Sequence, residues 1–156
     1  MDSIRLRSLA IGVFYFSTLF AVRVAYAAPA NACSFLTPAQ VSAVLGVTVG
    51  DGKSVVPKVC QWSVSGQSKK VLLTLLDERA FAYAKMPVGH GITKTPVSGT
   101  GDEALYGTTP RVATTLSVRK GKSAFTVRVA GFDETKDIDL IKQKEKTLAE
   151  EILSKM

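Results

Sequence analysis

Few residues of this chain combine a reactive type with a spacing that supports chemistry, and the strongest match is a glycine motif. Gly99, Gly101 and Ala104 fit the G-x-G-x-x-A pattern of dinucleotide-binding loops. In such loops the glycines follow a strand and open a helix, whose N-terminus binds the pyrophosphate. Here residues 96–98 are Pro, Val and Ser, and a strand is predicted over 102–106. The motif therefore indicates a glycine turn leading into a strand, and we expect no cofactor.

The only histidine, His90, lies between two glycines. A catalytic triad would need an acid and a nucleophile beside it, and the spacing of Asp102, Glu103 and the serines indicates no such arrangement. Cys33, Cys60 and His90 cannot fill the tetrahedral shell of a zinc ion without carboxylates. We expect an exposed loop histidine, no metal and no catalytic residue.

Adjacent carboxylates suggest helix positions rather than an acid–base pair. Asp77 and Glu78 are expected at the start of a helix, where negative charge is favourable. Glu150 and Glu151 are expected on a solvated helix face, with Glu151 four residues before Lys155.

The first residues have the organisation of a secretory signal. Arg5 and Arg7 precede an apolar run over residues 9–22, and the small residues Ala25 and Ala27 follow it. A membrane-spanning helix needs about 20 apolar residues, and this run is shorter. A positive start, a short apolar run and an Ala-x-Ala site are typical of a cleaved signal peptide.

We therefore predict cleavage after Ala27, with cleavage after Ala30 as a second choice and an uncleaved N-terminal anchor as the alternative. The prediction divides the chain into a signal peptide, 1–27, and a single α+β domain, 28–156. It places the mature protein in the periplasm or outside the cell, with no stable membrane anchor.

Cys33 has two possible roles near the new N-terminus. A lipoprotein signal wants an apolar residue three positions before the cysteine, and Ala30 with the polar Asn31 argues against lipidation. Two cysteines in an exported chain predict one disulfide, between Cys33 and Cys60. On the chain-entropy account this bond contributes about 3.5 kcal/mol.

The charge of the mature chain is positive. Removing the +2 of the predicted signal from the +7 of the whole chain leaves +5. This charge suits an anionic envelope partner and equally suits solubility. Phe125 is the only aromatic residue near the basic stretch at Arg119, Lys120 and Lys122, and it alternates inward, so we expect no nucleic-acid binding.

The N-terminal half of the mature chain predicts two helices and two strands. Thr37 caps a helix with Pro38 at its first position and Gln40 completing a capping box, and Gly46 ends it. The alternation of apolar residues then predicts strands over 58–64, with Cys60, Trp62 and Val64 on one face, and over 71–76. A short helix is expected over 78–86.

The C-terminal half predicts a hairpin and a closing helix. Two alternating segments between residues 111 and 131 are joined by a tight turn at Lys120-Gly121. A helix over 135–155 carries an apolar stripe, formed by Ile138, Ile141, Leu148 and Ile152. The fold class is α+β: an antiparallel sheet of about five strands with helices packed mainly on one face.

The segment 87–101 is predicted to be a long loop. Loops of fifteen residues are uncommon in compact domains and are often functional. Our hypothesis is that it forms a wall of a partner site, with His90, Lys94 and Asp102 as polar contacts. The alternative is a plain connector.

Several short motifs occur together in a recognisable order. They are "ACSFLTPAQVSAVLG", "CQW", "VSGTGDEALYG" and "LSVRKGKSAFTVRV". In this order the chain resembles small exported bacterial proteins and lipoproteins of unknown function. The resemblance implies that Cys33 pairs with Cys60 beside Trp62, and that the glycine-aspartate motif has a structural role. It implies no catalytic residue, cofactor or substrate.

We therefore expect an exported, non-catalytic binding domain with an unknown envelope or extracellular partner. The alternative is a secreted enzyme with an unrecognised site. An enzyme should line a pocket with convergent polar groups, whereas a binding module should present a shallow patch.

Overall fold

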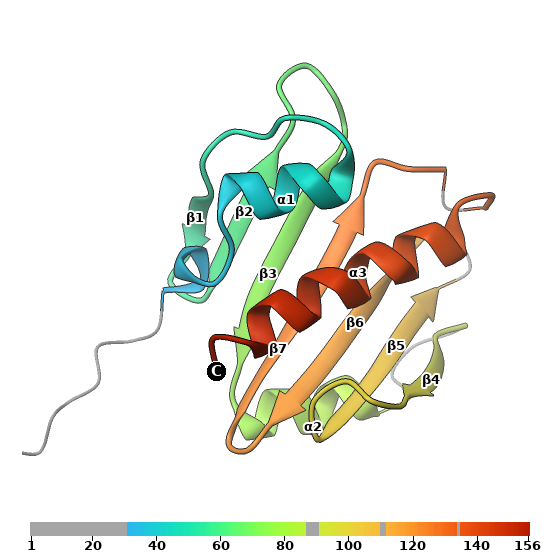
Figure 1. Cartoon of the computed structure of the whole chain (residues 1–156). Helices are drawn as coiled ribbons and strands as arrows, with labels where there is room; N and C mark the ends of the chain where they lie inside the picture. The colour runs from blue at the N-terminus through green and yellow to red at the C-terminus, as the bar shows by residue number, and fades with distance from the viewer. Residues whose placement is uncertain (1–30, 87–90, 110–111, 134) are drawn as a thin grey trace, which may run out of the picture.

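One antiparallel sheet organises the structure, a computed structural model that describes residues 31–86, 91–109, 112–133 and 135–156 (Figure 1). Its strand order is β1-β2-β3-β7-β6-β5-β4, so two meanders meet where β3 pairs with β7. In chain order the elements are η1 Ala32–Ser34, α1 Pro38–Leu45, β1 Lys53–Val56, β2 Val59–Ser63, β3 Lys70–Leu76, α2 Glu78–Lys85, β4 Thr93–Val97, β5 Glu103–Thr109, β6 Val112–Lys120, β7 Ser123–Ala130 and α3 Ile138–Leu153.

The α+β class and the antiparallel sheet are confirmed, but the prediction of about five strands is wrong, because the described residues form seven. The two missed strands, β1 and β4, are the edges of the sheet. All four residues of β1 are exposed, so they show no apolar alternation. β4 contains Pro96, which cannot donate to a ladder and is confined to edges.

The strand β4 also corrects the predicted loop over 87–101. Thr93–Val97 pairs with Glu103–Thr109 over five residue pairs, so the centre of that segment is sheet. Its first residues, 87–90, lie outside the described residues.

The predicted capping residues at both ends of α1 are present in the structure. The Thr37 hydroxyl accepts from the Gln40 N–H, and the Gln40 side chain accepts from the Thr37 N–H. Gly46 ends the helix with a left-handed backbone, φ 72°. Such a backbone favours glycine, so the predicted end of the helix is confirmed.

The β6–β7 hairpin is confirmed, with its turn one residue later than predicted. Lys120 pairs with Ser123, so Gly121 and Lys122 form the two-residue loop. Gly121 has φ 58°, which the positive-φ positions of tight hairpin turns require.

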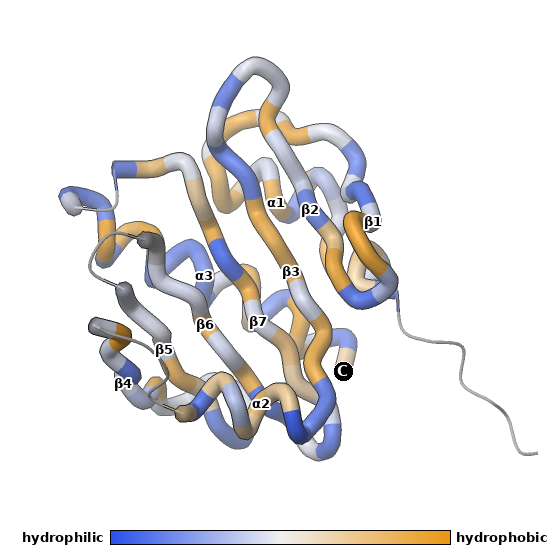
Figure 2. The backbone as a smooth tube through the Cα atoms, turned by 180° about the vertical axis from the view of Figure 1, so that it is seen from behind, coloured by the Kyte–Doolittle hydropathy of each residue, from blue (hydrophilic) through white to orange (hydrophobic). Residues whose placement is uncertain are grey.

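Helices lie on both faces of the sheet, which corrects the expectation that they pack mainly on one face. We call the face under α1 and α3 the front and the opposite face the back. The front core contains Trp62, Phe125 and Leu73, whereas Phe81 of α2 packs with Leu105 and Ala124 on the back. Figure 2 shows the back, where α2 crosses only one end of the sheet.

The closing helix α3 covers the middle of the front face. Its predicted stripe is confirmed at Ile141, Leu148 and Ile152, while Ile138 is half-buried. A fourth fully buried side chain, Glu145, lies among them, and its charge made it an unexpected core residue. No described helix has the length and hydrophobicity needed to span a bilayer.

Candidate functional site

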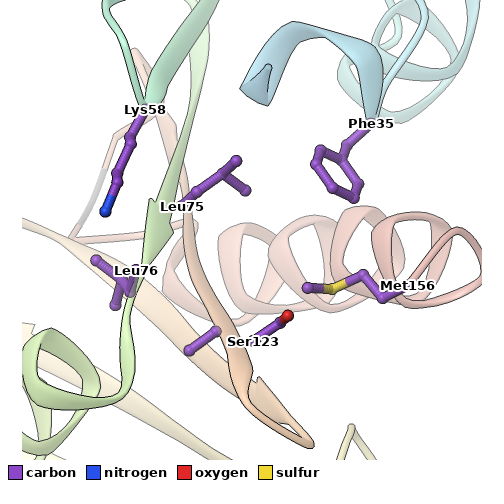
Figure 3. Close-up of a pocket in the computed structure, with 7 residues that line it drawn as sticks. Phe35, Lys58, Leu75, Leu76, Ser123 and Met156 are labelled. Atoms are coloured by element: carbon purple, nitrogen blue, oxygen red, sulfur yellow. The ribbon is translucent and has the colours of Figure 1, made fainter. Parts of the chain in front are cut away.

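A mainly apolar pocket lined by described residues lies at one end of the sheet and has a volume of about 210 Å³ (Figure 3). Five segments meet around it: the residue after η1, the turn between β1 and β2, the end of β3, the start of β7 and the residues after α3. Its lining residues are Phe35, Lys58, Leu75, Leu76, Ser123, Ala124 and Met156.

The disulfide holds one wall of this pocket in place. Cys33 in η1 bonds to Cys60 in β2, with 5.0 Å between their Cα atoms, and Phe35 follows two residues later. Cys60 is fully buried beside Trp62, and a Cβ on Gly52 would lie 2.7 Å from both side chains. The predicted disulfide is thus confirmed, and it is compatible with an oxidising, exported compartment.

One lysine lines the pocket, and two more contact the main chain of lining residues. Lys58 lies on its rim, 3.7 Å from the exposed carboxylate of Asp77. Lys155 donates to the carbonyl of Phe35 at 2.8 Å, and Lys120 donates to the carbonyl of Met156 at 3.2 Å. Among the described side chains at this end of the sheet, these three ammonium groups outnumber the one carboxylate that contacts any of them, that of Asp77.

The lining residues are suited to binding and lack a general acid–base pair. The only polar side chains among them belong to Lys58 and Ser123. The pKa of Asp77 is lowered, first by the N–H of Ala80 and then by Lys58, so this carboxyl stays charged and capped at the start of α2. A proton donor or acceptor poised near neutral pH is needed for acid–base catalysis.

The structure separates the residues predicted as partner contacts. His90 lies outside the described residues. Lys94 lies opposite Gly107 near the far end of β5, whereas Asp102 precedes the first residue of that strand. Five residues of strand separate these two positions by roughly 17 Å. Their role as partner contacts stays a prediction, and the two described residues do not share one site.

Asp102 already has a structural contact. Its carboxylate accepts from the N–H of Gly121 at 2.7 Å, and its own N–H donates to the carbonyl of Arg119 at 2.8 Å. Gly101 has φ 62°, and a Cβ there would lie 2.6 Å from the Arg119 oxygen. The glycine-aspartate motif thus fastens the start of β5 to the hairpin tip, which supports the structural role that the resemblance implied.

Glu145 is the polar site that sequence reasoning missed. The β6–β7 ladder ends at Leu116 and Val127, and the next core-facing positions are Thr114 and Val129. The Glu145 carboxyl bridges them: it accepts from the Val129 N–H at 3.1 Å and from the Thr114 hydroxyl at 2.9 Å. The helix side chain therefore replaces a missing interstrand partner.

Burial dominates the ionisation of this carboxyl. It raises the pKa of Glu145 to about 8, against the lowering effects of the Val129 N–H, Thr114, Arg128 and Lys142. Tyr106 of β5 lies nearby, and burial together with the Glu145 charge raises its pKa to about 12. Because Glu145 is fully buried, it has no access to a substrate, and its role is structural.

Among the described residues, no group of three histidine, cysteine or carboxylate side chains could hold a metal ion. Comparison with known proteins finds no matching family model, no matching curated protein and no matching solved structure. The functional conclusion therefore depends on the residues and geometry of this chain.

Proposed function

We propose that this protein is an exported, non-catalytic binding domain that takes an amphipathic anion in the pocket between Phe35 and Met156. The observation that carries the proposal is the combination of an apolar cavity with lysine ammonium groups around it. Apolar burial favours a hydrocarbon group, and the nearby ammonium groups favour a negative charge next to it.

The size of the pocket limits the ligand. A cavity of about 210 Å³ is smaller than the sites that hold drug-sized molecules. It corresponds to roughly seven water-sized groups, which is enough for a short acyl chain or one large side chain of a partner.

Export is the second part of the proposal. The signal pattern over residues 1–27 and the Cys33–Cys60 disulfide both support it. We expect purified protein to begin at Ala28 and to carry no lipid on Cys33, whose sulfur is used in the disulfide. Intact mass under non-reducing conditions checks both points, and a retained N-terminus or a diacylglyceryl adduct would contradict them.

Filling the pocket tests the binding site. Ser123 is exposed at the rim, so Ser123→Phe should occupy the cavity without disturbing the core. Hexanoate is the probe, and a ligand of this size should bind with a Kd on the order of 1 mM. We expect Ser123→Phe to weaken binding at least tenfold, whereas Lys122→Phe at the adjacent exposed position should leave it within twofold.

The charge requirement is tested with a matched cation. Hexylamine has the same chain length and the opposite charge, so the lysine groups should disfavour it. Hexanoate should bind at least fivefold more tightly than hexylamine, and Lys58→Gln should reduce this preference. Equal binding of the two probes, or equal binding by wild type and Ser123→Phe, would refute the proposed site.

A further inference from the structure

A row of side chains crosses the back face of the sheet outside the area covered by α2. From one edge, the strand register places Lys53, Gln61, Leu72 and Arg128 opposite one another. From the other edge it places Lys94, Gly107 and Thr115 opposite one another. The two halves meet at Arg128 and Thr115, which are the next positions along the ladder beyond the pair Leu116 and Val127. We call Lys53, Arg128 and Lys94, with the residues between them, the basic row.

The cations of the basic row form no salt bridge with the described residues, although the charge of Arg128 acts on the buried carboxyl of Glu145. Lys53 is exposed, and Lys94 extends over Gly107, since a Cβ there would lie 3.1 Å from its Nζ. Lys70, in the adjacent row opposite Ala130, adds a fourth cation on this face. No described salt bridge involves any of these four residues; the described bridges belong to Lys58, Lys85, Arg119 and Lys136.

One acidic group faces the back among the described strand residues, and it lines a pocket together with Lys94 of the row. Among the described strand residues facing this side, the carboxylate is that of Glu103, which contacts Lys85 of α2 at 2.5 Å and Arg119 at 3.4 Å. Both contacts lower the pKa of Glu103 and keep it charged. The carboxylate of Glu103 is therefore already paired with two cations, and α2 crosses only one end of this face (Figure 2).

Arg128 lies at the centre of the row and is half-buried. Its Nε is buried and makes no hydrogen bond with the described residues. An arginine whose stem is held by the sheet presents a planar fork suited to bidentate binding of an oxyanion.

The spacing of the row favours an extended ligand. Neighbouring strands lie about 4.8 Å apart, so Lys53 and Arg128 are separated by roughly 14 Å and Arg128 and Gly107 by roughly 10 Å. A single compact anion reaches one of these cations, whereas a polymer reaches all three. Hydroxyl and amide groups from Thr115, Thr126 and Gln61 lie along the same path.

We propose that the basic row binds an extended, non-nucleic phosphate polymer, with Arg128 at the centre of the contact. Phosphate offers more acceptor oxygens per group than carboxylate. It can therefore accept hydrogen bonds from both the cations and the neutral donors of the row. Single-stranded nucleic acids are bound with aromatic stacking platforms, and the described residues of the row include no aromatic side chain. This surface is separate from the apolar pocket.

The test is a titration of the protein with linear polyphosphate of about twenty units at low salt, with the Kd measured by calorimetry. We expect Arg128→Gln to weaken binding at least tenfold and the double change Lys53→Gln with Lys94→Gln to weaken it similarly. Lys122→Gln removes one exposed charge at the hairpin tip, away from the row, and should change the Kd less than twofold. Orthophosphate should bind at least a hundredfold more weakly than the polymer.

Because the double change alters two side chains at the edges of the sheet, it tests the row even if Arg128→Gln fails to fold. Adding salt should weaken binding of the wild type more steeply than binding of the double variant, since fewer contacts release fewer counterions. Equal losses in Lys122→Gln and the double variant would overturn the proposal and indicate attraction by net charge alone. Polyglutamate binding as tightly as polyphosphate, or an absence of polyphosphate binding at low salt, would also overturn it.

Discussion

The front and back of the sheet are built from the same strands and differ in what their side chains do. On β3, Leu73 faces the front and is fully buried, whereas its neighbour Leu72 faces the back and is half-buried. The front is closed by two helices, a disulfide and a carboxyl that satisfies an unpaired strand N–H. The back has one short helix at one end and, within the part of the chain that the structure describes, a row of cations that form no salt bridge. This difference indicates that the contacts that stabilise the fold are concentrated on the front face. The back face is therefore available for contacts with other molecules.

The largest expected effect concerns the buried carboxyl of the front face. Because the pKa of Glu145 is raised from 4.5 to about 8, the folded chain keeps a proton that the unfolded chain has released. The free energy of unfolding should therefore fall as the pH rises from about 4.5 to about 8, by on the order of 4 kcal/mol. Urea unfolding at four pH values across this window, followed by Trp62 fluorescence, measures the slope.

The matched variants of this experiment are Glu145→Gln and Glu150→Gln. A glutamine at 145 keeps an acceptor for the Val129 N–H and a donor toward Thr114, so it should remove most of the pH dependence and stabilise the protein at pH 8. Glu150 lies exposed on the same helix, and its replacement should preserve the slope. A wild-type slope that survives in Glu145→Gln would show that this carboxyl is charged in the folded state.

The next effect compares the two faces directly. Leu73→Ala should cost about 3 kcal/mol, because it leaves a cavity among Cys60, Val127 and other fully buried residues. Leu72→Ala on the back should cost about 1 kcal/mol or less. Chemical denaturation of both variants checks the difference, and equal costs would show that the back is covered as closely as the front.

The smallest stability effect tests the structural role of the glycine-aspartate motif. Gly99 and Gly101 both have positive φ, but only at Gly101 would a Cβ meet the backbone of Arg119. Gly101→Ala should cost about 2 kcal/mol and Gly99→Ala about 1 kcal/mol. Thermal unfolding of the two variants separates the cost of the Cβ clash at Gly101 from the cost of a positive φ, which both positions share. A Gly101→Ala variant as stable as Gly99→Ala would argue against the tight contact with Arg119.

Sequence reasoning succeeded where the signal is local. The α1 caps, the Cys60 and Trp62 alternation and the hairpin each depend on residues a few positions apart. Edge strands give weaker signals, because β1 is exposed throughout and β4 contains a proline. For Glu145 a signal was available: the spacing of Ile141, Glu145, Leu148 and Ile152 places the carboxylate in the apolar stripe of α3.

The apolar pocket could not be predicted from the sequence. Phe35 and Met156 lie at opposite ends of the described chain and meet only because the disulfide and α3 bring them to the same end of the sheet. The basic row has the same origin, since Lys53 and Arg128 share a row only through the register of three strand pairs. Both features depend on long-range pairing that a pattern of neighbouring residues does not contain.

The most direct test of the proposed function is a methyl NMR titration with hexanoate. After removal of residues 1–27, the chain has two methionines: Met156, which lines the pocket, and Met86, which is 47% exposed after α2 and serves as an internal reference. With 13C-methyl methionine labelling, the account predicts a saturable shift of the Met156 signal at millimolar hexanoate and a stationary Met86 signal. A stationary Met156 signal, or parallel drift of both signals without saturation, would contradict the claim that this end of the sheet is a binding site.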